Sequence, residues 1–180
     1  MGVIVESLRV DPRYPVGRFQ GPEIVTHEHR SAAIADLLEL PERLHAAVDG
    51  LDAEQLNTPY RDGGWTVRQV VHHLADSHMT TFLRIKLALT DDWPTIVPRH
   101  WDEWAKLDDV TASVELSLGI VEGVQPRWVK LLQSLNEEQW QRGFQHPEKG
   151  RMTIESVTLR YGWHSRHHVG HITQLGLNGG

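Results

Sequence analysis

The stretch YGWHSRHHVGHITQL, residues 161–175, places four histidines within eight positions. On a helix, side chains four residues apart lie on the same face, one turn apart. His167 and His171 therefore point in one direction and can share one ion. His164 and His168 form a second such pair, rotated a little around the helix axis. Taken alone, the pattern is compatible with a metal site and equally with polar histidines on a solvated face.

A catalytic zinc-type site takes three protein ligands and keeps one position open, so a third ligand has to come from another segment. Residues 66–93 show an apolar stripe at helical spacing, with three histidines beside it. A wheel at about 100° per residue puts His73 at the border of the stripe, His72 on the outward side and His78 within the apolar face. We expect His73 at a seam between helices, where bundle proteins build metal sites, and His78 in the core with a hydrogen bond.

Four segments of the chain have the apolar spacing of amphipathic helices. They cover about residues 23–50, 66–93, 109–134 and 153–177. Thr66 is a candidate N-cap for the second helix. Alternating strand patterns are missing, so the predicted fold class is all-α, a four-helix bundle. Residues 1–22, with three prolines and three glycines, are expected to form an extended arm laid on the domain.

Prolines mark the expected irregularities of these helices. We expect Pro41 to kink the first helix or to split it in two, and Pro126 to break or kink the third near Val124. Residues 91–109 are expected to form a long loop with one short helical turn, since they combine two prolines with three tryptophans.

The composition fits one soluble domain over residues 1–180. A net charge of −6 and a pI near 6.0 argue against nucleic acid or an anionic membrane as the main partner. Cysteine is absent, so a metal ion must bind to His, Asp or Glu, and any thiol must come from another molecule. The start MGVIVESLRV has no basic region before its apolar run, and no apolar stretch reaches the length of a membrane span. We therefore expect a cytoplasmic protein.

Three segments together carry a family resemblance: TPYRDGGWTVRQVVHHLADSHM at 58–79, RGFQHPEKG at 142–150 and YGWHSRHHVGHITQL at 161–175. They resemble the DinB/YfiT-like superfamily and, within it, the YfiT-type metal-dependent hydrolases. The segment DPRYPVGRF at 11–19 also resembles the start of that family. The resemblance thus covers nearly the whole chain.

This resemblance implies a four-helix bundle that holds one divalent metal ion on three histidines. The family's first ligand precedes Leu in its W-T…H-H-L segment and matches His73, and its H-x-x-x-H pair matches His167 and His171. His164 and His168 are then expected either to contact the ligand histidines without binding the ion or to lie at the surface. Zinc is the first expectation for the ion and nickel the second, because imidazole nitrogen suits both. The resemblance also implies a homodimer.

Three neutral imidazoles leave the charge of the ion uncompensated and part of its coordination sphere open. Such an ion lowers the pKa of a bound water to about 7, and it deprotonates a bound thiol. The first hypothesis is therefore a metal-dependent hydrolase that activates water against a small-molecule substrate. The first alternative is a metal-dependent thiol S-transferase that joins a low-molecular-weight thiol to an electrophile, an activity of relatives in the superfamily. The second alternative is a non-catalytic bundle stabilised by metal.

Further polar residues accompany these motifs. Asp76, one turn after His73, is a candidate general base or a partner that orients this imidazole, with a solvated carboxylate as the alternative. Arg160 and Arg166 are candidates for contact with an anionic substrate or are surface residues. Gln174 is a candidate partner of a ligand. We expect the tryptophans at 65 and 163 to pack in the bundle.

Overall fold

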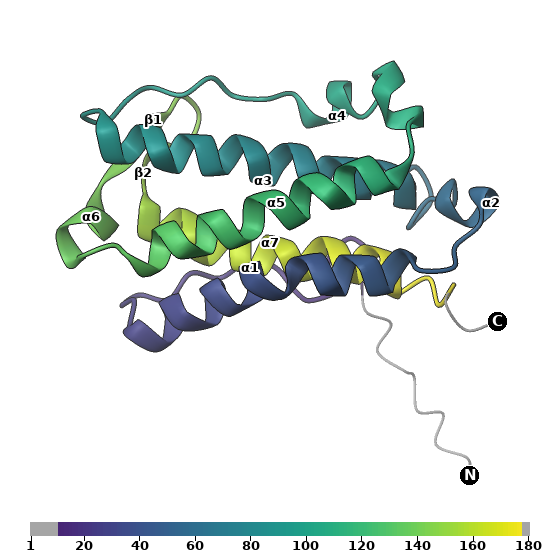
Figure 1. Cartoon of the computed structure of the whole chain (residues 1–180), viewed down its shortest axis with the longest axis horizontal. Helices are drawn as coiled ribbons and strands as arrows, with labels where there is room; N and C mark the ends of the chain where they lie inside the picture. The colour runs from purple at the N-terminus through teal and green to yellow at the C-terminus, as the bar shows by residue number, and fades with distance from the viewer. Residues whose placement is uncertain (1–10, 178–180) are drawn as a thin grey trace, which may run out of the picture.

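The computed structural model describes residues 11–177. Its long helices are α1 (His27–Val48), α3 (Val67–Thr90), α5 (Val114–Gln133) and α7 (Ile154–Thr173). They lie side by side, and α1 and α3 each pack against both α5 and α7 (Figure 1). The predicted four-helix bundle is therefore confirmed. No helix within 11–177 has both the length and the apolar character that crossing a membrane requires.

Shorter elements connect the long helices. They are α2 (Ala53–Leu56), α4 (Trp101–Trp104), η1 (Asp108–Thr111), α6 (Glu137–Gln141), β1 (Gly143–His146) and β2 (Gly150–Thr153). The connection after α3 returns along the length of that helix before α5 begins, so α3 and α5 run in the same direction (Figure 1). The expected loop at 91–109 contains the expected short helical turn, α4, and in addition the start of η1.

Side-chain caps fix where the long helices begin. The Thr66 hydroxyl accepts a hydrogen bond from the Gln69 backbone N–H, and the Gln69 side chain accepts one from the Thr66 N–H. Thr26 caps α1 in the same reciprocal way, which places the start of α1 four residues later than the apolar pattern suggested. Each such cap satisfies backbone donors that the first turn leaves unpaired. The predicted Thr66 cap is confirmed.

The alternative of a break at either proline is wrong, whereas a kink stays a prediction. Pro41 lies inside an uninterrupted α1 and Pro126 inside an uninterrupted α5. A proline inside a helix costs about 3 kcal/mol, because it removes one backbone hydrogen bond and crowds the preceding turn. Buried residues lie on both sides of each proline, among them Leu40 before Pro41 and Trp128 after Pro126. Packing both halves of each helix into the same core outweighs the local cost.

A short antiparallel hairpin is the other departure from the predicted all-helical pattern. Strand β1 pairs with β2 from Gly143 opposite Thr153 to His146 opposite Gly150. Gly150 has a φ of 73°, a left-handed conformation that suits glycine at the turn. Each strand has four residues, which is too short for an alternating pattern to stand out in the sequence.

The core consists of two apolar clusters separated by polar side chains. The first cluster contains the beginning of α3 and Ile172 of α7, and the second contains the end of α3 and Ile154 of α7. On each of these helices, and on α5, the positions between the clusters are polar. We call this set the polar layer; it comprises Ser77, His78, Thr81, Gln125, His164, Ser165 and His168. A polar layer inside a bundle places chemistry where water is excluded.

The described part of the N-terminal arm, residues 11–26, lies against α7, as expected from the sequence. Gln174 donates a hydrogen bond to the Pro12 carbonyl over 3.1 Å, and the Trp163 indole N–H donates to the Gly17 carbonyl over 3.1 Å. A Cβ at Gly170 would lie 3.0 Å from Pro15, so glycine lets the arm approach the helix. Residues 1–10 of the predicted arm lie outside the described residues.

Helices α1 and α7 approach each other closely at Gly162. A Cβ at this position would lie 2.8 Å from the Cα of Ala33 and 3.0 Å from its Cβ. Neither atom belongs to a flexible side chain, so neither can turn away. The spacing of the two helices therefore depends on the absence of a side chain at position 162.

We predict that Gly162→Ala lowers the free energy of unfolding by about 1–3 kcal/mol, because the added methyl overpacks the α1–α7 contact. Gly119→Ala is the matched control, since nothing lies within 4 Å of a Cβ built at this helical glycine. There the substitution should raise the free energy of unfolding by about 0.5–1 kcal/mol through helix propensity. Urea denaturation followed by circular dichroism measures both, and equal effects at the two sites would contradict the prediction.

Candidate metal centre

Three histidines from two helices converge where α3 meets α7. His73 of α3 and His164 and His168 of α7 each present a ring nitrogen, and these three atoms lie within 4.8 Å of one another. The Nε2 atoms of His73 and His164 are 3.3 Å apart. The ring of His168 has its centroid 4.8 Å from that of His73 and 4.4 Å from that of His164. We call these three residues the inner histidine group.

A second group overlaps the first along α7. It contains His167, His168 and His171, whose ring nitrogens also lie within 4.8 Å of one another. Tyr60 stacks on His171 with ring centroids 3.9 Å apart, and the Nε2 of His171 lies 3.3 Å from the Arg13 carbonyl oxygen of the arm. We call this set the outer histidine group. His168 belongs to both groups.

The structure places the predicted ligands in different groups. His73 lies at a seam between helices, as the helical wheel predicted, and its neighbours there are His164 and His168. Within residues 11–177, the ring nitrogens of His73, His167 and His171 do not form a group with this spacing. The ligand set of His73, His167 and His171 thus stays a prediction. The surface position considered for His168 is wrong, because this residue is only 8% exposed.

The inner group fits a metal ion by its donor atoms and its spacing. Zinc–imidazole bonds of 2.0–2.1 Å in a tetrahedral site imply nitrogens about 3.3 Å apart. The two Nε2 atoms of His73 and His164 have a separation of 3.3 Å. Two unprotonated imidazole nitrogens facing each other at this distance repel unless a proton or a cation lies between them. The site therefore has the form of a cation site made of neutral nitrogen donors.

Burial keeps these imidazoles neutral. Loss of hydration lowers the pKa of His73 to about 3, and it lowers the pKa values of His164 and His168 well below the usual histidine range. For His167, burial lowers the pKa to about 4, with a smaller contribution from the charge of His171. Neutral imidazole is the form that binds metal, so the fold presents its donors ready for an ion at pH 7.

Two predictions for polar residues of α3 meet different outcomes. His72 was expected to face outward, but it is 9% exposed and its Nδ1 lies 2.7 Å from the Ser117 hydroxyl of α5. The wheel failed because it placed only one buried seam on α3, whereas this helix has neighbours on two sides. His78 is fully buried and hydrogen-bonded, as expected. Asp76 makes no hydrogen bond to His73 in the described chain, and burial, followed by the charge of Asp109, raises the pKa of its carboxyl group.

The other polar candidates lie outside the inner group. Arg166 pairs with Asp36 of α1, and Arg160 lies over the Phe19 ring. The Gln174 side-chain amide donates a hydrogen bond to the Pro12 carbonyl and not to a ligand imidazole. Each of these contacts joins α7 to the arm or to α1.

A cavity of about 340 Å³ opens over the outer group, and through His168 it also reaches the inner group. Its walls include Tyr60, Trp65, Arg61 and Asp102. Trp65, which was expected only to pack, lies with its ring centroid 4.7 Å from that of His73. Arg61 has no carboxylate partner within 11–177, and its Nε is buried without a hydrogen-bond partner. In the sequence, the only indication of these wall residues is the position of Trp65 directly before the Thr66 cap.

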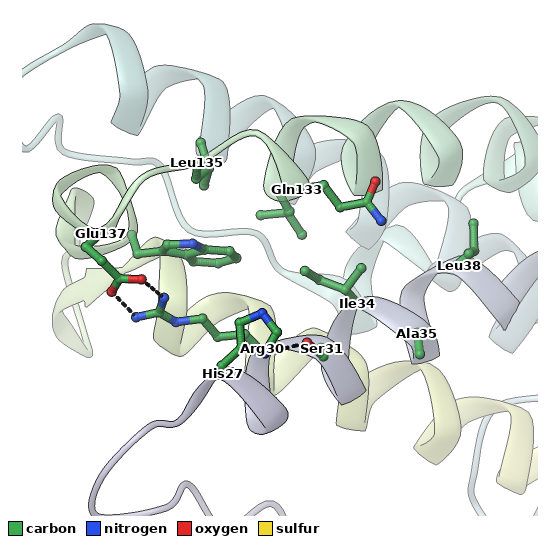
Figure 2. A pocket seen from close by; sticks show the side chains of 11 residues that line it. His27, Arg30, Ser31, Ile34, Ala35, Leu38, Gln133, Leu135 and Glu137 are labelled. Carbon is green, nitrogen blue, oxygen red and sulfur yellow. Dashed lines mark hydrogen bonds and ion pairs between the residues drawn. The ribbon is translucent and has the colours of Figure 1, made fainter.

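A larger cavity of about 470 Å³ lies between α1 and the α5–α6 connection (Figure 2). Its cation, Arg30, pairs with Glu137 and Glu155 and lies over the Trp140 ring. None of the clustered histidines lines this cavity. The charge of its cation is thus compensated by two carboxylates, and the cavity over the histidines is the better candidate for a reaction site.

Known proteins share this fold and several of these segments. Residues 36–172 match the family model described as the DinB superfamily. Proteins of Bacillus cereus (strain 03BB102) and Bacillus thuringiensis subsp. konkukian (strain 97-27), both named "Putative metal-dependent hydrolase", are each 47% identical over 165 residues. The matches cover 92% of this chain and 95% of each relative.

Two solved structures are also similar. YfiT from Bacillus subtilis, described as "a probable metal-dependent hydrolase with an unusual four-helix bundle topology", is 45% identical with a TM-score of 0.89. That match covers 93% of this chain and 97% of the YfiT chain. TT2238, a four-helix bundle protein, has a TM-score of 0.58 at 19% identity over 81% of this chain and 98% of its own, which shows the fold alone.

We predict that the metal-free protein loses stability as the pH falls below about 6.5, the pKa of histidine in an unfolded chain. The folded-state pKa values of His73 and His78 are about 3, so the unfolded chain binds more protons in the interval between. Each such ring lowers the free energy of unfolding by about 1.4 kcal/mol per pH unit within this window. Urea unfolding at several pH values measures the slope, and equal stability at pH 7.5 and pH 5 would contradict the prediction.

Proposed function

The chain belongs to the DinB superfamily, and on this basis we propose that it is a metal-dependent hydrolase whose ion binds to the inner histidine group. The observation that carries the proposal is the convergence of three neutral ring nitrogens within 4.8 Å, two on buried histidines and one on the partly buried His164. The names of the relatives support the reaction class, and the imidazole donors support the ion.

The inner group is preferred over the predicted ligand set for two reasons. It contains His73, which the family resemblance assigns as a ligand, and it contains a pair four residues apart, His164 and His168, on the side of α7 that faces α3. The outer group lacks His73, and the Nε2 of His171 already faces the Arg13 carbonyl. The set of His73, His167 and His171 is the alternative that the same experiment tests.

The chemistry follows from the charge of the site. A bound divalent ion with neutral nitrogen ligands lowers the pKa of water from 15.7 to about 7 and polarises a carbonyl group. The protein contributes the fixed ring positions and a wall of aromatic side chains, in which Trp65 lies beside His73 and Tyr60 covers His171. The 340 Å³ cavity beside these rings reaches His168 of the inner group and can take a small-molecule substrate. Zinc is the first proposal for the ion and nickel the second.

We predict that alanine substitutions separate the ligand sets. His73→Ala, His164→Ala and His168→Ala should each weaken zinc binding by more than the about 10–100-fold that follows loss of a ligand's outer partner. His167→Ala and His171→Ala should keep the affinity within a few-fold of the unchanged protein. Competition with a chromophoric zinc chelator measures the affinities.

Two other outcomes of this experiment are equally informative. Loss of zinc in the 73, 167 and 171 variants alone would establish the predicted set. Loss in the 167, 168 and 171 variants alone would place the ion in the outer group and contradict the proposal.

We predict that the zinc- or nickel-loaded protein hydrolyses members of an ester and amide panel without added thiol, and that His164→Ala abolishes the turnover. Each reaction is run with and without a small thiol. Conjugates that form only with thiol would identify a thiol S-transferase instead. Absence of turnover in both series, together with unfolding on chelation, would identify a metal-stabilised bundle. A homodimer and a cytoplasmic location stay predictions from the sequence.

A further inference from the structure

A chain of hydrogen-bonding groups leads from the inner histidine group into the centre of the bundle. The Nδ1 of His164 lies 3.2 Å from the Nε2 of His78. The Nδ1 of His78 in turn lies 2.5 Å from the side-chain amide of Gln125 on α5. His78 and Gln125 are both fully buried, so no bulk water competes for these contacts. The three helices α3, α5 and α7 each supply one member.

Each neutral imidazole in this chain has one N–H and one unprotonated nitrogen. A donor at one end therefore fixes the direction of every hydrogen bond that follows. With both rings neutral, the chain has two arrangements of its protons. The Gln125 amide can serve either one, as a donor through its nitrogen or as an acceptor through its oxygen.

In the first arrangement, the Gln125 N–H donates to His78, His78 donates to His164, and the Nε2 of His164 carries a proton toward His73. This proton occupies the 3.3 Å gap between the two Nε2 atoms. In the second arrangement, the Gln125 oxygen accepts from the Nδ1–H of His78, and the Nε2 of His78 accepts from the Nδ1–H of His164. The Nε2 of His164 is then unprotonated and free to bind an ion.

We propose that Gln125, acting through His78, is a positioning residue: when an ion binds, its side-chain oxygen supplies the acceptor that the metal-competent tautomer of His164 requires. The inference rests on the proposed function, because it takes His164 as a ligand. It assigns a role to a fully polar side chain at a core position of α5, between Val121 of the first apolar cluster and Trp128 of the second. A histidine that binds a metal ion generally donates its other ring N–H to a hydrogen-bond acceptor, which fixes its tautomer and orientation.

The Gln125 amide has to turn over between the two arrangements. With its nitrogen toward His78, its oxygen is buried without a hydrogen-bond partner. Reversal exchanges this unpaired acceptor for an unpaired donor, so neither arrangement has an advantage from the amide itself. Ion binding at His73 and His164 then decides the direction, because only one arrangement leaves their facing nitrogens unprotonated.

The test compares Gln125→Met with Gln125→Glu. Methionine has a similar length and no strong acceptor, so zinc affinity should fall about 10–100-fold, as for other partners behind a ligand. Glutamate keeps an oxygen acceptor and should restore the affinity to within a few-fold of the unchanged protein. Urea unfolding of the metal-free variants shows that both fold. Nitrogen-15 spectra of the histidine rings should show an Nδ1–H tautomer for zinc-bound His164, replaced in Gln125→Met by a tautomer mixture or by an unbound ring.

Ser117→Ala is the matched control. Ser117 lies two turns earlier on α5 and contacts His72, a buried histidine outside the inner group. Its loss removes a similar buried hydrogen bond and should leave zinc affinity and the His164 spectrum unchanged. If Gln125→Met binds zinc as tightly as the unchanged protein, the role of Gln125 is overturned. If His164→Ala binds zinc normally, the proposed metal centre itself fails, and the two failures are thereby distinguished.

Discussion

The bundle has to keep a row of uncharged imidazoles inside a protein core. Burying a charged ring without a partner costs far more than burying a neutral one, so the polar layer is stable only while its histidines are unprotonated. Two apolar clusters above and below this layer supply the burial. The same condition makes the rings suitable for metal, since the neutral form is the one that coordinates. Stability and the proposed chemistry thus depend on one property, the low proton affinity of buried histidine.

The topology brings the donors together from distant parts of the chain. Helices α3 and α7 are separated by the whole of α5 and the hairpin in sequence, yet His73 and His164 meet at 3.3 Å. The long return between α3 and α5 makes those two helices run in the same direction (Figure 1), which sets Gln125 level with His78. The N-terminal arm and Tyr60 cover His171 of the outer histidine group, about one further turn along α7. One helix therefore carries histidines toward the core and toward the cavity.

His164 connects the two sides of this arrangement. Its Nε2 faces His73, and its Nδ1 faces His78 and, beyond it, Gln125. A ligand bound only by its own helix would be free to rotate, whereas this ring is held at both nitrogens. The names of the relatives and of the similar YfiT structure agree with a metal site in this family. A preformed site lowers the ordering cost of binding.

The sequence by itself determined the features that depend on local periodicity: four helices, the Thr66 cap, His73 at a seam and two histidine pairs on the last helix. It did not determine which pair faces α3, because the two pairs differ by a rotation of only about 60° around the same axis. That rotation is set by contacts with remote segments, Gly162 against Ala33 and Gly170 against Pro15. Contacts with remote segments also decided that α1 continues through Pro41 and that His72 is buried against α5 instead of facing outward. Periodicity fixes angles within one helix, whereas the absolute orientation of a helix is a property of its neighbours.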